Sequence, residues 1–330
     1  MKRSKLLFLS SIFLLIFLAI FGGSWWLFGS LETQKKIVRI PKHSSARKIS
    51  SILYKNGLIK SRFFFYLYVR ISGFDKKLSY GKYLFEGKNS VADVVDILLS
   101  GRVFLSRVMI KEGSSLSESL DQIAESGLVT RALLDSLAHD KILIDSLTGM
   151  DLESLEGFIY PETYFFDDNI SGKELLVHIV KHFYQLTTGL DFLKQKELNF
   201  YQVLTLASIV EKESVLLQEK PLIASVYLNR LAVGQRLQAD PTIVYFLRKS
   251  GKKTKRVYYR DLKIDSPYNT YLYKGLPPTP ICSPTVSSIQ AVLSPEVTDY
   301  FYFVASKRGR HIFSKTYKEH LRKIRNIRGK

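Results

Sequence analysis

The sequence predicts an α+β protein with a single N-terminal transmembrane helix, a small strand-helix-helix-strand subdomain and a larger α+β domain. Three observations support this prediction. A long uncharged run stands near the start of the chain. A segment with strand and helix signals then occurs twice in the first half, and the second half holds an almost wholly apolar helix with charged residues in it.

The composition is that of an ordinary globular chain. Of the 330 residues, 46% are hydrophobic and 24% are charged, which excludes a disordered chain and leaves room for about two domains. The only cysteine, Cys282, excludes a disulfide framework and a cysteine-based zinc site. Much of the net charge of +19 comes from residues 248–260 and 307–330. We interpret both stretches as solvated basic surface near anionic phospholipid, and expect no nucleic-acid partner because neither contains a binding motif.

The N-terminus predicts a membrane anchor. Residues 6–28 form an uncharged run, and about 20 apolar residues suffice to cross a bilayer as a helix. A cleaved signal peptide is the alternative, but its apolar region is shorter, about 7–15 residues. Trp25 and Trp26 suit the membrane interface at the outer end of the run. We expect the basic residues 1–5 to be a cytoplasmic tail, and the body to be periplasmic or extracytoplasmic on a single-pass protein of the plasma (inner) membrane.

An internal repeat organises the first half of the chain. Its two copies, which align without gaps, are residues 40–64 and 110–134. Each copy predicts a short strand, a serine-capped helix, a glycine stop and a second helix. Ser115 and Glu118 have the spacing of a capping box, and Gly57 and Gly127 suit the left-handed position after a helix.

Between the two copies the sequence predicts one more strand and one more helix. Tyr83 and Phe85 alternate as in a half-buried strand, and Ser90 with Asp93 opens a helix. Units of strand, helix, helix and strand resemble LysM modules, which bind glycans containing N-acetylglucosamine. The resemblance implies a LysM-like subdomain over residues 37–109 that binds glycan or positions substrate. A structural spacer is the alternative.

The motifs of several common enzyme classes are absent from the sequence. It has no P-loop, G-x-S-x-G, H-E-x-x-H or G-x-G-x-x-G pattern. His178 and His182 are four residues apart, a spacing that can bind metal, but no carboxylate or cysteine pattern completes such a site. We therefore expect surface histidines and neither a metal ion nor an organic cofactor.

Residues 200–217 are the most informative segment. They predict a helix that is apolar almost all round and therefore buried, packed on short strands such as residues 300–305. The helix nevertheless carries Glu211, Lys212 and Glu213. Because burial disfavours a charged carboxylate, it raises the pKa of a glutamate, as a catalytic acid at neutral pH requires.

Helical spacing separates the two glutamates. The neighbours of Glu213 three, four and seven residues away are leucine, isoleucine and valine, whereas those of Glu211 are smaller and more polar. Desolvation therefore favours Glu213 as the proton donor. The alternative is a structural carboxylate paired with Arg230 or another base.

Polar loops follow this helix. Loops rich in Tyr, Asn, Gln and Pro can line a sugar groove through stacking and amide hydrogen bonds, or can serve as loop scaffolding. The loops are residues 238–242, 266–271 and 275–278.

Eight segments carry a resemblance to a known family. In chain order they are LEGFIYPETY at 155–164, ASIVEKE at 207–213, VYLNR at 226–230, LQADPT at 237–242, SPYNTY at 266–271, GLPP at 275–278, YFV at 302–304 and HIFS at 311–314. Together they closely resemble the endolytic murein transglycosylases, the MltG/YceG-like family, over nearly the whole chain. Two departures are Glu162, where the family usually has aspartate, and Thr279, where glycine is common.

The resemblance implies a lytic transglycosylase, a carbon-oxygen lyase acting on a polysaccharide, with residues 110–325 as its catalytic domain. Such enzymes cleave the β-1,4 bond between N-acetylmuramic acid and N-acetylglucosamine in nascent peptidoglycan, leave a 1,6-anhydro end and terminate glycan elongation. The implied partners are peptidoglycan glycan strands and peptidoglycan synthases. The resemblance places the catalytic glutamate on Glu213, which acts first as acid and then as base, with no need for the second carboxylate of ordinary glycosidases.

Motif membership also implies supporting or substrate-binding residues. They are Glu211, Ser214, Asn229, Gln238, Asp240, Tyr268, Asn269 and Tyr271. Two other functions remain open at this stage. One is an inactive glycan-binding scaffold, and the other is a hydrolase whose second carboxylate is Glu211 or Asp240 and whose products are reducing ends.

Overall fold

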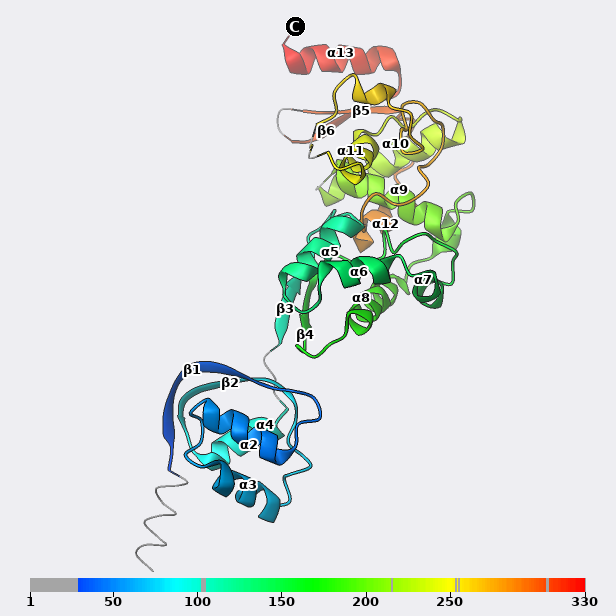
Figure 1. Cartoon of the computed structure of the whole chain (residues 1–330). Coiled ribbons are helices and arrows are strands. Elements are labelled where there is room, and N and C mark those ends of the chain that lie inside the picture. The colour runs from blue at the N-terminus through cyan, green and yellow to red at the C-terminus, as the bar shows by residue number, and fades with distance from the viewer. Residues whose placement is uncertain are drawn as a thin grey trace, which may run out of the picture. The chain divides into compact units, whose positions relative to one another are not determined.

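The structure confirms the α+β class. The computed structural model describes residues 29–101, 105–214, 216–252, 254, 256–306 and 309–329. Helices and small two-stranded sheets make up this part of the chain (Figure 1). Within it, no helix is both long and apolar enough to cross a membrane. The expected cytoplasmic tail at 1–5 and transmembrane helix at 6–28 lie outside the described residues.

Packing divides the chain into two compact units. Unit 1 reaches to Ser106 and includes Phe165–Ile170, and unit 2 comprises Arg107–Tyr164 and Ser171–Lys330. These units are defined by packing alone. They do not test the functional domains expected at residues 37–109 and 110–325, which remain predictions.

Unit 1 has the strand, helix, helix and strand order expected for this part of the chain. Its elements are β1 (Leu31–Ile40), α2 (Ala46–Lys55), α3 (Arg62–Ile71), β2 (Gly81–Asn89) and α4 (Val91–Leu99). β1 and β2 pair antiparallel, from Leu31 opposite Asn89 to Ile40 opposite Gly81. The alternating Tyr83 and Phe85 of β2 are fully buried, and the helices cover this face of the sheet with apolar side chains. The likeness to LysM modules stays a prediction.

A returning segment of the chain completes unit 1. Asp168 forms an ion pair with Lys82 of β2, and its Oδ1 accepts a hydrogen bond from Ser106 Oγ at 2.6 Å. The neighbouring Asp167 accepts the backbone N–H of Asn169, which closes the turn. Residues 165–170 thus belong to unit 1 through polar contacts with residues that are distant in the sequence.

The remaining elements lie in unit 2, except for Ser106 and residues 165–166, which unit 1 includes. The first are β3 (Ser106–Met109), α5 (Leu116–Glu125), α6 (Arg131–Ala138), α7 (Lys141–Thr148), β4 (Thr163–Phe166), α8 (Gly172–Thr187), η1 (Phe192–Lys194) and α9 (Phe200–Glu213). The others are η2 (Leu217–Glu219), α10 (Lys220–Ala232), α11 (Asp240–Lys249), η3 (Asp261–Lys263), α12 (Val286–Leu293), β5 (Tyr302–Ala305), β6 (His311–Ser314) and α13 (Tyr317–Arg328). β3 pairs with β4, β5 pairs with β6, and α13 packs against β5 and β6 (Figure 1).

The local structure of the repeat is as expected in both copies. Ser45 caps α2 and Ser115 caps α5, where Glu118 completes a capping box. Gly57 and Gly127 follow these helices with φ of 71° and 74°. Only glycine adopts this left-handed conformation without steric cost, so the same residue type stops the helix in both copies.

Helix α9 is the central element of unit 2. Asn199 and Gln202 form a capping box at its start, and every residue from 203 to 211 is buried. The helix packs mainly against α10, α11 and α12, whereas β5 packs mainly against β6, α13 and α10. The expectation that α9 packs on the strand near residues 300–305 is therefore wrong. Three helices supply the apolar surface that α9 requires.

Candidate active site

The expected helix over residues 200–217 is shorter in the structure. α9 ends at Glu213, because Ser214 adopts an extended backbone with φ of −138° and ψ of 133°. Leu216 and Leu217, expected as helical neighbours of Glu213, lie beyond the helix and are 38% and 66% exposed. Glu213 therefore occupies the last helical position rather than the middle of a buried helix.

Glu213 points toward helix α10. Its Oε1 accepts a hydrogen bond from the hydroxyl of Tyr227 at 2.7 Å, and Tyr227 is only 1% exposed. No other side-chain hydrogen bond within the described part of the chain reaches the Glu213 carboxyl. Its second oxygen, Oε2, thus has no side-chain partner among the described residues.

Burial raises the pKa of Glu213 to about 7. The negative charge of Asp240 adds to this shift, while the Tyr227 hydrogen bond and the positive charges of His311 and Arg230 oppose it. One hydrogen bond does not replace the water that a carboxylate loses on burial. A glutamate with this pKa can both give and take a proton near neutral pH.

Glu211 lies two residues away in a different environment. Its Oε2 accepts hydrogen bonds from Lys220 Nζ at 3.1 Å, from the Thr285 N–H and hydroxyl at 3.0 and 2.6 Å, and from the Ser288 hydroxyl at 2.6 Å. The Glu211 and Lys220 side chains are each 4% exposed. Burial alone would raise the pKa of Glu211, but the hydrogen bonds from Ser288 and Thr285 and the Lys220 charge hold it below the ordinary value.

The apolar neighbours that the sequence suggested explain only part of the contrast between these two glutamates. Glu211 is only 8% exposed and Glu213 is partly exposed. They differ in the number of donors, because a carboxylate that accepts several hydrogen bonds stays ionised in a buried place. Glu211 links α9 to α10 and α12, and its carboxylate already accepts hydrogen bonds from Lys220, Thr285 and Ser288.

Arg230 does not pair with Glu213. It lies one helical turn after Tyr227, and its guanidinium donates to the carbonyls of Phe301, at 2.7 Å, and Leu237. Arg230 thereby holds the loop before α11 against α10, and its charge stays near the site. The alternative interpretation of Glu213 as an arginine-paired structural carboxylate is thus not supported by the geometry.

Asp240 and Tyr271 form the nearby polar wall. The Tyr271 hydroxyl donates to Asp240 Oδ1 at 2.5 Å. Burial raises the pKa of Tyr271, the hydrogen bond to Asp240 adds to this rise, and the Glu213 charge contributes. Gln238, two residues before Asp240, has a φ of 51°, and its N–H donates to the Thr270 carbonyl at 3.0 Å. This left-handed residue turns the loop so that α11 starts at Asp240.

Four other residues expected at the site use their side chains for hydrogen bonds within the chain. Asn229 Nδ2 donates to the carbonyls of Thr298 and Tyr300, and buried Asn269 Nδ2 donates to those of Leu262 and Ile264. The Tyr268 hydroxyl bonds to Thr279, and the Ser214 hydroxyl accepts the Leu216 N–H. These side chains shape the loops that surround the site, and their polar groups are largely satisfied by the chain itself.

The sequence interpretation missed two residues of this site. Tyr227 binds the Glu213 carboxyl directly, and His311 of β6 lies close enough for its charge to lower the pKa of Glu213. His311 is held by Glu219, whose Oε2 is 2.7 Å from the His311 Nδ1. Both residues belong to segments that carry the family resemblance. That signal could have suggested them, but helical periodicity could not.

The structure also reveals a second buried carboxyl group with a shifted pKa. Glu156 is 3% exposed, and burial raises its pKa to about 7. Its Oε1 accepts the Leu116 N–H at 2.8 Å and its Oε2 accepts the Tyr245 hydroxyl at 2.9 Å. Both oxygens of Glu156 are therefore occupied, whereas Glu213 keeps one oxygen available.

The other candidate groups, His182 and Cys282, make contacts within the fold. His182 Nε2 is 2.5 Å from Glu162 Oε2, so the longer carboxylate at this position reaches α8. Cys282 is fully buried, and burial raises the pKa of its thiol well above the ordinary value. In the described ranges, no cluster of three or more His, Cys, Asp or Glu side chains is arranged to hold a metal ion.

The fold and the site define a class of protein. It is an α+β protein whose larger unit presents one protonatable glutamate at the end of a buried helix, beside a tyrosine and a bound arginine. The chain belongs to the YceG-like family, whose family model matches residues 38–326.

Named relatives and a solved structure agree with this membership. A protein of Bacillus subtilis named endolytic murein transglycosylase is 33% identical over 86% of this chain and 82% of its own length. A Streptococcus pneumoniae protein of the same name is 28% identical over 87% of this chain, which spans 57% of the pneumococcal protein. The crystal structure of a YceG-like protein from Listeria monocytogenes has a TM-score of 0.61, with 32% identity over 88% of this chain and 98% of that one.

Proposed function

We propose that this protein is an endolytic lytic transglycosylase that cleaves peptidoglycan, with Glu213 as its catalytic residue. The observation that carries the proposal is the Glu213 carboxyl, whose pKa is raised to about 7 and whose Oε2 has no side-chain partner among the described residues. A carboxyl with this pKa is near the optimum for proton transfer at neutral pH. The names of the B. subtilis and S. pneumoniae relatives support murein as the substrate.

The first step is acid catalysis. Protonated Glu213 donates its proton to the oxygen of the β-1,4 bond between N-acetylmuramic acid and N-acetylglucosamine. The bond from that oxygen to C1 breaks, and positive charge develops on the muramic acid ring. The N-acetylglucosamine side leaves with its hydroxyl restored, and Glu213 becomes a carboxylate that the Tyr227 hydroxyl stabilises.

The second step is base catalysis by the same residue. The Glu213 carboxylate takes the proton from the C6 hydroxyl of the muramic acid, and the C6 oxygen attacks C1. This closes a 1,6-anhydro ring and regenerates protonated Glu213 without the addition of water. The attack is intramolecular and so gains from proximity, and one carboxyl group suffices. Asp240 and Tyr271 provide the polar wall beside the reacting sugar.

The same proposal includes the place of action. Residues 6–28 anchor the protein in the plasma (inner) membrane, with residues 1–5 in the cytoplasm and the body on the outer side. In this position the enzyme meets nascent strands and ends their elongation beside the peptidoglycan synthases. A LysM-like subdomain at residues 37–109 would hold the strand near the site.

A digest of purified peptidoglycan tests the proposal. The full chain in detergent and its Glu213→Gln variant are compared by mass spectrometry of the products. The expected result is 1,6-anhydromuramyl ends from the wild type, and a rate reduced about 10²–10⁴-fold in the variant, as for loss of a general acid-base group.

Other products would lead to other functions. Reducing ends would indicate a hydrolase and make Asp240 the first candidate for its second carboxylate. Glycan binding without cleavage would indicate a scaffold protein.

A further inference from the structure

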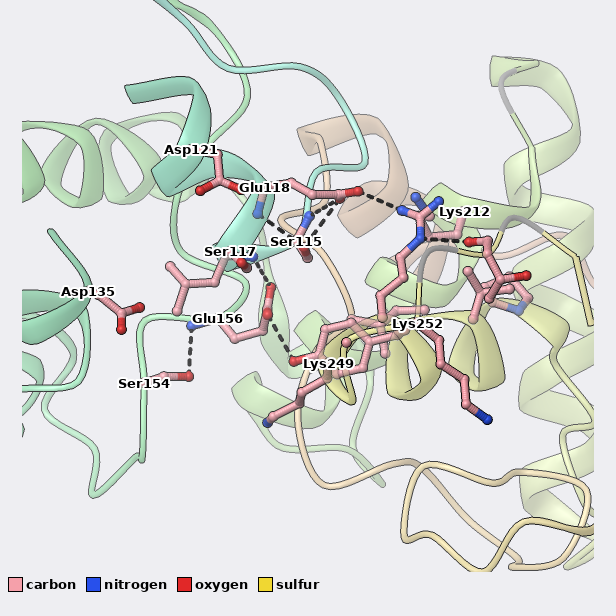
Figure 2. A pocket seen from close by; sticks show the side chains of 18 of the residues that line it. Ser115, Ser117, Glu118, Asp121, Asp135, Ser154, Glu156, Lys212, Lys249 and Lys252 are labelled. Carbon is pink, nitrogen blue, oxygen red and sulfur yellow. Dashed lines mark hydrogen bonds and ion pairs between the residues drawn. The ribbon is translucent and has the colours of Figure 1, made fainter. Parts of the chain in front are cut away.

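A cavity of about 690 Å³ opens beside helices α5, α6 and α11 in unit 2 (Figure 2). Its volume lies within the range of about 300–1,000 Å³ that is typical of small-ligand pockets. Glu213 is not among its lining residues, but Lys212, the residue before it, is. Pro241, which follows Asp240, also lines the cavity. The cavity thus shares helices α9 and α11 with the proposed active site.

The walls of the cavity are unusually rich in charge for a site that binds a neutral sugar. Several of these charges neutralise one another. Glu118 pairs with Arg248 at 2.6 Å, and Arg131 pairs with Asp121 at 2.7 Å and with Asp135 at 2.9 Å. These pairs fix the rim and leave little net charge there.

Three lysines remain without a carboxylate partner among the described residues. Lys212 Nζ donates to the Gly113 carbonyl at 2.9 Å. The Lys249 ammonium group lies 5.8 Å and 5.4 Å from the ring centroids of Tyr245 and Tyr268. Lys249 and Lys252 are exposed and border the cavity (Figure 2). Glu156 also lines the cavity, where burial raises its pKa and the Lys249 charge opposes that rise. The five Lys and Arg side chains of the lining still exceed its four carboxylates, so the cavity offers an excess of positive charge to an anionic ligand.

Apolar side chains form another part of the lining, beside polar ones such as Ser115, Ser117 and Ser154. The apolar ones are Leu116, Pro241, Val244 and Ile281, with the ring of Tyr245. This combination of ammonium groups and aliphatic surface does not suit a polyol. It suits a short peptide that carries carboxylates and small aliphatic side chains. The peptide stems of peptidoglycan, which are attached to N-acetylmuramic acid, have this chemistry.

The dimensions of α11 match such a stem. The helix runs from Asp240, next to the Glu213 site, to Lys249 at the cavity. Nine steps of 1.5 Å give a rise of about 13.5 Å. An extended peptide of four residues spans at most about 13–14 Å. A stem attached to a muramic acid at Glu213 can therefore reach Lys249 along the helix.

We propose that this cavity binds the peptide stem of the glycan strand, with Lys249 and Lys252 contacting its carboxylates. The inference rests on the proposed function, because it takes peptidoglycan as the substrate. It assigns a role to the start of the basic stretch at 248–260. It also makes the enzyme selective for strands that still carry stems.

Two substrates and one double variant test the proposal. The full chain in detergent is assayed on uncrosslinked glycan strands with stems, and on the same strands after an amidase has removed them. In the Lys249→Gln/Lys252→Gln variant we expect KM for stem-bearing strands to rise about tenfold, which is ~1.4 kcal/mol. The value of kcat and the kinetics on stem-free strands should change less than about twofold, within the ~0.5 kcal/mol of neutral surface changes.

A matched control and a binding measurement separate the possible failures. Lys194→Gln/Lys196→Gln removes the same charge from exposed positions outside the cavity lining and should leave KM in place. An equal rise in KM on both substrates, or no rise, would overturn the stem site. If the wild type cleaves neither substrate, the proposed function fails. Calorimetric titration of the full chain with a free stem tripeptide then decides the stem site, because its binding should be lost in the Lys249→Gln/Lys252→Gln variant.

Discussion

Tyr227 donates its phenolic hydrogen to Glu213 Oε1 across 2.7 Å, from one buried helix to the end of another. This contact has two effects. It fixes one oxygen of the carboxyl and leaves the other open, and it stabilises the carboxylate against its buried surroundings. Because Tyr227 is a single neutral donor, it does not keep Glu213 fully ionised. Burial still holds the pKa of Glu213 at about 7. An arginine in the same place would have kept Glu213 ionised.

The first prediction concerns the pH profile of the wild type. A general acid must be protonated to act, and the Glu213 pKa is raised to about 7. Lytic activity should therefore fall as the pH rises through about 7, with the protonated form lost on the basic side. The measurement is kcat/KM against pH on purified glycan strands. A profile that stays flat from pH 6 to 9 would contradict the assignment of Glu213 as the acid.

The second prediction uses the two neighbours of Glu213. The Tyr227 hydrogen bond lowers the pKa of Glu213 and the Asp240 charge raises it. The fall in activity at high pH is the basic limb of the profile. This limb should therefore move to higher pH in Tyr227→Phe and to lower pH in Asp240→Asn. The opposite directions are the control, since damage to the fold would not move the limb both ways. Shifts in the same direction would mean that another group titrates.

The third prediction concerns Glu156, whose pKa is also raised to about 7 by burial. Both of its oxygens are held by the chain itself, so we do not expect it to exchange a proton with substrate. The basic limb should therefore stay in place in Glu156→Gln. Loss of the limb in this variant, with Glu213 intact, would transfer the acid to Glu156. The pH profile is informative here because it separates a proton donor from a residue that only shapes the cavity.

The sequence predicts local features of this protein better than their assembly. The helix caps and glycine stops are set within a few residues, so Ser115, Glu118 and Gly127 could be identified directly. The end of α9 could not, because the apolar pattern continues through Leu216 and Leu217 although the backbone turns at Ser214. Apolar periodicity reports burial, but not the point where a helix stops.

The same holds for the active site, where the sequence predicts a single residue better than its contacts with other helices. Glu213 could be singled out from its apolar surroundings and from the family resemblance. The hydrogen bond from Tyr227 could not be predicted, because it joins two helices whose packing the sequence does not reveal. The four hydrogen bonds to Glu211 come from residues 9 to 77 positions away, so spacing within α9 could not show why this glutamate stays ionised.

The fourth prediction concerns the only cysteine. Cys282 is fully buried, and its Sγ–H donates to the Ser208 carbonyl at 3.4 Å. Burial raises the pKa of the thiol, so the reactive thiolate is scarce in the folded protein. The native chain should therefore not react with a thiol reagent such as Ellman's reagent at pH 8, and should release the equivalent of one thiol after denaturation. Rapid labelling of the native chain would contradict the burial of this residue.

The fifth prediction concerns stability and the buried pair of Glu211 and Lys220. The two side chains are each 4% exposed, and removal of one partner leaves a buried charge without compensation. Glu211→Gln should therefore lower the free energy of unfolding by about 3–5 kcal/mol. Thermal unfolding should show this as a decrease in Tm of roughly 2–4 °C for each kcal/mol. The exposed Glu197→Gln is the matched control, and its Tm should equal that of the wild type.

The pH dependence of this stability has a definite sign. The pKa of Glu211 is lower in the folded protein than in the unfolded chain. Its contribution is therefore complete above the unfolded pKa and is lost as the pH falls through the folded pKa. The gap in Tm between wild type and Glu211→Gln should be largest near neutral pH and narrow as the solution becomes acidic. A gap that is constant with pH would mean that the lost stability comes from packing rather than from the ionised carboxylate.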